Sequence, residues 1–298
     1  MGPENLLEQE VLIAKVRDLA SRDERLVAAL MYGSFAMSEG DHLSDIEFYL
    51  YFGAPLDRVD RRRWLEPIGS IELHYVNEFG TDTAIFANAI RGEFHFEPAT
   101  SIPSVARWDN AWFPSQNAAI VLDRTGELTR TLAPFAQEPP AKDSRTTAEF
   151  VSRSLTNWTL MGANLLNRGE SAGALALLGR VHVDALKAAR MIEGSTVHWL
   201  SPSRHLEDDI SPESYERFRT CTAALAEPGL RAAYVATWRW ARELMDVLAA
   251  RHELALPHGL LSQIDERVSS PIHRRVLASD DALGSQSRVT PRDGSSEA

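Results

Sequence analysis

The sequence predicts an α+β protein in which a mixed sheet comes first and a bundle of helices follows. Strand-like runs occur up to about residue 123, whereas beyond residue 145 apolar residues recur at helical spacing. The two halves are joined at 137–145 by a segment with two prolines and charged residues, which is typical of a linker. A ligand site between two such halves is the default expectation. The expected domains are 1–140, 141–255, and 256–298 as an extension with a disordered tail.

Each element follows from its own pattern of residues. Residues 5–21 have the spacing of an amphipathic helix, and the apolar run that closes on Gly33 favours a buried strand. Further strands are expected at 45–52, 71–76 and 118–123, a short surface helix at 57–66, and one long strand or a kinked hairpin at 83–96. Helices are expected in the second half at 146–168, at 171–193, from an N-cap at Ser211, and at 229–252.

Composition excludes several classes of protein. The chain of 298 residues has 31 Lys and Arg against 42 Asp and Glu, a net charge of -11, so nucleic acid is not an expected partner. Cys221 is the one cysteine, which excludes an internal disulfide and a cysteine-based zinc site. No signal peptide and no apolar window of about 18 residues is present, so the expectation is a cytoplasmic protein without a membrane partner.

Two acids at the start of the expected strand 45–52 predict a metal site. Asp45 and Glu47 are two residues apart and therefore project from the same strand face. Adjacent carboxylates repel each other unless a cation lies between them, and oxygen ligands suit Mg²⁺. The alternative is a pair of solvated surface acids.

Gly33 and Ser34 close the preceding strand and could contribute to the same site. Glycine allows a phosphate to approach the backbone closely, and the next N–H and hydroxyl can donate to it. In the 83–96 segment, Arg91, Glu93 and His95 share one strand face, which favours either a site-bearing strand or an exposed face with a salt bridge. Other acids and arginines are expected to be ordinary surface groups: Glu39, Asp41 and Asp82 in loops, and the run 61–63 on a helix.

The motifs MYGSF, EGD, SDIEFYL, RGEFHF and LMG-x-N-x-L-x-RGE resemble the lincosamide nucleotidyltransferases, within the superfamily related to DNA polymerase beta. The resemblance extends over most of positions 10–255. It implies a catalytic nucleotidyltransferase domain that binds a nucleoside triphosphate, usually ATP, with Mg²⁺. The hydroxyl of a lincosamide antibiotic then attacks the α-phosphorus, and pyrophosphate leaves.

The resemblance also implies roles for individual residues. Gly33 and Ser34 would hold the triphosphate, and Asp45 and Glu47 would be metal ligands. Glu93 would be the third carboxylate, as general base or as ligand of a second metal ion.

One departure from the superfamily concerns how the triphosphate is neutralised. Many members have a basic residue and a glycine after the Gly-Ser pair, where this chain has Met37 and Ser38. The compensating charge is expected from Arg91, Lys187 or Arg190. The domain 141–255 would contribute to the acceptor site, and its Trp158 and Trp199 are candidates for lining an acceptor pocket, the alternative being that they belong to the core.

Several alternatives remain open at the level of the sequence. The acceptor could be an aminoglycoside, another small metabolite or a protein, and an inactive nucleotide-binding relative is a further reading. By analogy within the family, a homodimer is an open option.

Overall fold

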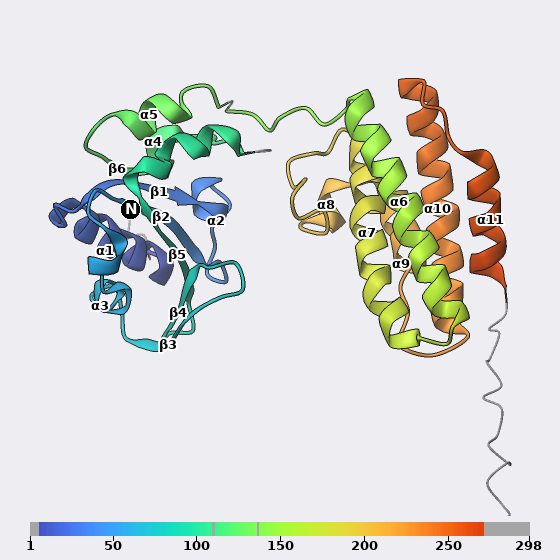
Figure 1. Ribbon diagram of the computed structural model, residues 1–298, viewed down its shortest axis with the longest axis horizontal. Helices are drawn as coiled ribbons and strands as arrows, with labels where there is room; N and C mark the ends of the chain where they lie inside the picture. Colours follow the sequence, from blue (N-terminus) through green and yellow to red (C-terminus); the bar gives the residue numbers. More distant parts are fainter. Residues whose placement is uncertain (1–5, 109–110, 136, 271–298) are drawn as a thin grey trace, which may run out of the picture. The chain divides into compact units, whose positions relative to one another are not determined.

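The computed structural model describes residues 6–108, 111–135 and 137–270 of the chain. Two compact units divide it, Met1–Ala141 and Lys142–Ala298. Each unit has a hydrophobic core of its own. The first holds a six-stranded mixed sheet and the second is helical, which confirms the α+β class (Figure 1).

The sheet of the first unit has the strand order β3-β4-β5-β2-β1-β6. The central strands β2 and β5 are parallel, and the other described pairs are antiparallel. The strands are β1 (Leu26–Tyr32), β2 (Ile46–Phe52), β3 (Ile71–Val76), β4 (Asp82–Phe86), β5 (Arg91–Pro98) and β6 (Ile120–Asp123). The helices are α1 (Glu8–Arg22), α2 (Gly33–Ala36), η1 (Leu56–Arg58), α3 (Arg61–Leu65), η2 (Ala99–Arg107), α4 (Gln116–Ala119) and α5 (Glu127–Leu132).

The central strands β2 and β5 separate an apolar face from a polar one. Ile46, Phe48 and Leu50 alternate on β2 with Glu47 and Tyr49, as the twofold period of a strand requires. The first three are buried in the core, together with Phe94 and Phe96 of β5. The alternate residues of both strands share the opposite face, and that face carries the acids singled out from the sequence.

Several expected elements differ in detail from the observed ones. The segment 83–96 forms a hairpin, β4 and β5, whose turn precedes Arg91. The helix at 57–66 is divided into η1 and α3, and α3 buries Trp64 instead of lying wholly on the surface. The strand β3 alternates in sequence yet leaves Leu73 and Tyr75 exposed, because it lies at the edge of the sheet.

The second unit is built from helices whose sequence signals are clear. Ser144 caps α6 by accepting from the N–H of Thr147, and Ser211 caps α9 ahead of a proline at the first helical position. Figure 1 shows α6, α7 and α10 running alongside one another, and each contacts the other two. The helices are α6 (Arg145–Asn167), α7 (Ser171–Glu193), α8 (Leu206–Asp209), α9 (Pro212–Thr220), α10 (Gly229–His252) and α11 (His258–Ser269).

The segment expected as an extension at 256–298 contributes to this unit. Helix α11 contacts α6 and α10, and its Leu261, Ile264 and Val268 are buried in the core. The tail beyond residue 270 lies outside the described residues. Within the described ranges, no helix combines the length and the apolar character needed to cross a membrane.

Candidate active site

Three carboxylates converge on the polar face of the central strands. Glu47 on β2 lies directly opposite Glu93 on β5 in the parallel register, and Asp45 comes one residue before β2 begins. One oxygen from each of the three side chains lies within 4.8 Å of the others. All three side chains are partly exposed, so the cluster is open to a ligand from solvent. The structure therefore brings together the acids expected at the metal site.

Gly33 is in contact with this cluster. It has a left-handed φ of +72°, and a Cβ atom at this position would lie 1.3 Å from Oε2 of Glu47. Only glycine leaves room for the carboxylate here, and only glycine adopts this backbone conformation without strain. Ser34 follows as the second residue of the short helix α2 and is buried. The turn that ends β1 and the acids of β2 thus form one local structure.

Arg91 connects two of the acids. Its Nη1 donates to Oδ2 of Asp45 at 2.6 Å, and its Nη2 donates to Oε1 of Glu93. Burial alone would lower the pKa of Arg91, but the charges of Glu93 and Asp45 outweigh that effect and raise it. The guanidinium remains about two fifths exposed. It partly neutralises the acids and lies where an anionic ligand of the cluster would meet it.

Glu93 has further partners that the sequence did not single out. The hydroxyl of Tyr32 donates to its Oε2 at 3.4 Å, and the side-chain amide of Asn77 donates to its Oε1 at 3.4 Å. Burial raises the pKa of Tyr32, and the charges of Glu47 and Glu93 raise it further. The available signal for Tyr32 was its position, immediately before Gly33 at the end of a strand. Asn77 belongs to a turn and offered no such signal.

An aromatic group extends along the same face of the sheet. Tyr49 stacks on His95 with ring centroids 4.0 Å apart, and Trp108 packs against Tyr49 at 4.7 Å. Tyr32 contacts both Tyr49 and His95. Burial lowers the pKa of His95, although the charges of Glu93 and Asp82 oppose this effect. The acids therefore have an aromatic wall on one side.

Ser38 shows how the chain departs from the superfamily pattern. It occupies the position where related sequences have glycine, and its φ of 62° is in the left-handed region that favours glycine. Ser38 thus adopts a backbone conformation that glycine adopts without strain. The neighbouring position, where the superfamily pattern has a basic residue, holds the uncharged Met37, whereas Arg91 on β5 contacts the acids.

Asp82 is not the ordinary loop acid expected from the sequence. It begins β4 and is 1% exposed. Its carboxylate binds Arg61 at 2.8 Å and His74 at 3.0 Å. Arg61 is likewise not simply solvated, because this ion pair holds it against the sheet. The pair was missed because Arg61 lies on α3 and Asp82 on β4, and only the folded structure brings the two together.

The two basic residues of the helical unit expected near the triphosphate, Arg190 and Lys187, differ in how far they are buried. Arg190 is fully buried, and its guanidinium donates to Asp209, Ser195 and the carbonyl groups of Pro202 and Arg204. This corrects the expectation that it binds a triphosphate, because its donors already have partners inside the unit. Lys187 lies 5.3 Å from the ring of Trp199, and burial lowers its pKa.

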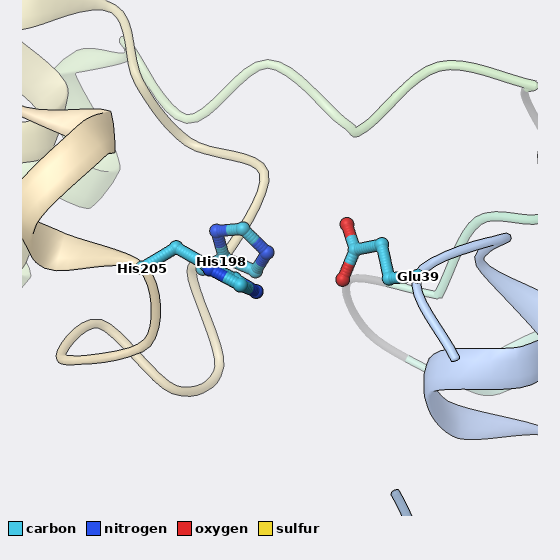
Figure 2. A group of neighbouring side chains, drawn as sticks. All are labelled: Glu39, His198 and His205. Carbon is cyan, nitrogen blue, oxygen red and sulfur yellow. The ribbon is translucent and has the colours of Figure 1, made fainter. Parts of the chain in front are cut away.

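The loop between α7 and α9 carries two neighbouring histidines. Figure 2 shows His198 and His205, whose ring centroids lie 5.0 Å apart. Nδ1 of His198 is 2.5 Å from Asp209, the same acid that binds Arg190. Burial alone would raise the pKa of Asp209, but these two partners lower it. The loop is thus held by a buried ion-pair network. Glu39, also drawn in Figure 2, belongs to the loop after α2 in the first unit.

Comparison with known proteins identifies the helical unit. Residues 144–267 match the family model of the lincosamide nucleotidyltransferase-like C-terminal domain. No curated protein matches the chain. Two similar solved structures are an aminoglycoside 6-adenyltransferase from Bacillus subtilis and a nucleotidyltransferase-like protein from Exiguobacterium sibiricum 255-15.

The first of these structures is 11% identical, with a TM-score of 0.41, and the match covers 89% of this chain and 100% of that one. The second is 12% identical, with a TM-score of 0.34, and the match covers 87% and 88%. The family match, with the motifs of the first half, confirms the resemblance and the class of enzyme. Residues 144–267 thus match the C-terminal domain of lincosamide nucleotidyltransferase-like proteins, and this match together with the motifs of the first half identifies the chain as a nucleotidyltransferase.

Proposed function

We propose that the protein transfers a nucleoside monophosphate, AMP from ATP in the first instance, to a hydroxyl of a lincosamide antibiotic and thereby inactivates the drug. The observation that carries this proposal is the convergence of Asp45, Glu47 and Glu93 beside the turn at Gly33. The family of the helical unit supports the choice of a lincosamide as acceptor.

The residues of the cluster fit a magnesium ion. All three donors are carboxylate oxygens, which are the ligands that Mg²⁺ prefers. Asp45 and Glu47 would hold it, and Glu93 would either complete the set or remain free for the acceptor. When bound, Mg²⁺ would supply the positive charge that offsets the negative triphosphate during transfer.

The chain's own groups would bind the triphosphate and accept the proton. The turn at Gly33 and Ser34 would hold the triphosphate, and Ser34 offers an N–H and a hydroxyl. Arg91 is the nearest described cation to the acids and would exchange a carboxylate for a phosphate oxygen.

Glu93 is proposed as the general base. It would accept the proton of the acceptor hydroxyl as that oxygen bonds to the α-phosphorus and pyrophosphate leaves. Its side chain is 19% exposed and is therefore shielded from bulk water but accessible to a ligand. A base in this position contributes about 10²–10⁴-fold to the rate.

The test is pyrophosphate release with ATP and Mg²⁺ in the presence of lincomycin, clindamycin or kanamycin. We expect release with the first two acceptors, loss of it in Asp45→Asn, and a fall of about 10²–10⁴-fold in Glu93→Gln. Glu72→Gln is the matched control, because Glu72 is an exposed acid on the edge strand β3. Release with kanamycin alone would assign an aminoglycoside acceptor instead. No release with any acceptor would contradict the proposed transfer.

A further inference from the structure

Glu93 is held by a chain of hydrogen bonds that enters the site from its buried side. The hydroxyl of Tyr32 lies 2.9 Å from Nε2 of His95 and 3.4 Å from Oε2 of Glu93. On the other side of the imidazole, Nδ1 of His95 lies 3.4 Å from the hydroxyl of Thr81. These contacts connect the end of β1 and the interior of β5 with Thr81, one residue before β4, so three separate segments fix their geometry.

The number of protons available fixes which group donates and which accepts in each of these hydrogen bonds. A carboxylate only accepts hydrogen bonds, so the single proton of the Tyr32 hydroxyl must point to Glu93 if that bond forms. The oxygen of Tyr32 is then free only to accept, and Nε2 of His95 must carry the hydrogen. A neutral imidazole has one N–H, so its Nδ1 must be the acceptor, which matches the hydroxyl of Thr81.

We propose that Tyr32 and His95 are positioning residues for Glu93, with His95 neutral and protonated on Nε2. This inference rests on the proposed function, in which Glu93 meets the acceptor hydroxyl. The relay directs donors from Thr81 through His95 and Tyr32 onto Oε2 of Glu93. It fixes that oxygen and leaves Oε1 to face Arg91 and the other acids.

The surroundings of the relay support this arrangement. Tyr49 stacks on the imidazole at 4.0 Å and limits its rotation. Thr81 is 2% exposed, so its hydroxyl has little water to compete with the ring nitrogen.

The kinetic test compares variants that keep or remove one donor. Glutamine places an amide N–H near the position of Nε2, so His95→Gln keeps the donor to Tyr32 while His95→Leu removes it. We expect Tyr32→Phe and His95→Leu to lower kcat by roughly 10- to 100-fold, the size expected for one bond to a charged group, with KM for ATP unchanged. His95→Gln should recover most of kcat. Tyr49→Phe is the control, because it keeps the ring that stacks on His95 and removes a hydroxyl on the same face.

Equal losses in His95→Gln and His95→Leu would show that the ring acts only by packing, and full kcat in Tyr32→Phe would overturn the relay. A second measurement does not depend on turnover. The ¹⁵N NMR spectrum of the wild-type protein should show His95 with a protonated Nε2 and a bare Nδ1, and the opposite tautomer would overturn the proposal. If no acceptor supports turnover in the wild type, the transfer reaction fails while the tautomer still decides the relay.

Discussion

At the scale of single residues, the site depends on Gly33 having no side chain. Gly33 has no Cβ, and Oε2 of Glu47 occupies the space where one would be. The left-handed backbone favours glycine at this position, and any larger residue would in addition displace the carboxylate of Glu47. The Gly-Ser pair is a weak signal when read alone, but the structure makes it part of the acid cluster.

We expect Gly33→Ala to displace the carboxylate of Glu47 and to abolish pyrophosphate release. Gly80→Ala is the matched control. Gly80 has a similar φ of +80°, but nothing lies within 4 Å of its added Cβ. Both variants should lose about 1–2 kcal/mol of stability from the backbone, while only the first should lose activity. Equal activity in the two variants would show that the contact with Glu47 is unimportant.

At the scale of elements, sequence patterns predicted helices and strands better than they predicted exposure. The apolar spacing at 5–21 correctly indicated α1, yet Leu6 and Val11 of that pattern are exposed while Leu12 and Val16 are buried. Phe150 on α6 is likewise 62% exposed although its spacing suggested the core. Periodicity defines a face, but neighbouring elements decide how much of that face is covered.

The contact between α6 and α10 offers a test at this scale. A Cβ at Gly162 on α6 would lie 2.2 Å from the hydroxyl oxygen of Tyr234 on α10. That tyrosine is fully buried and donates to the carbonyl of Ala174 at 2.7 Å. We expect Gly162→Ala to destabilise the helical unit by about 1–3 kcal/mol, even though alanine favours helices.

Gly179→Ala provides the comparison, because Gly179 is an exposed position on α7 with nothing within 4 Å. It should be stabilising by about 0.5–1 kcal/mol. Chemical denaturation of both variants measures the two effects. A stabilised Gly162→Ala would mean that Tyr234 can move aside without loss.

At the scale of the whole molecule, the division into a sheet unit and a helical unit was readable from composition and periodicity. The pairing of strands was not. The parallel register that sets Glu47 opposite Glu93 joins segments separated by two other strands, and no local pattern encodes it. The ion pair of Arg61 on α3 with the buried Asp82 on β4 was missed because no local pattern brings these two segments together. The sequence was therefore sufficient to identify the acids of the site. It was not sufficient to predict which residues contact them.

Separate cores lead to an expectation for heat denaturation. Because the two hydrophobic clusters share no residue, we expect two transitions in calorimetry. Gly162→Ala should lower only the transition of the helical unit. ATP with Mg²⁺ should raise that of the sheet unit, since a ligand stabilises the state that binds it. One transition that responds equally to both changes would show that the units unfold together.

The Arg91 guanidinium that links Asp45 and Glu93 also affects the stability of the metal-free protein. Like charges left alone would push the strand ends apart, whereas an internal counter-ion lets the chain fold and persist without metal. An incoming ion must then compete with a partner already in place, which weakens its binding relative to three bare acids. Occupancy of the metal site would accordingly rise with nucleotide concentration, because the phosphates would pair with the displaced Arg91.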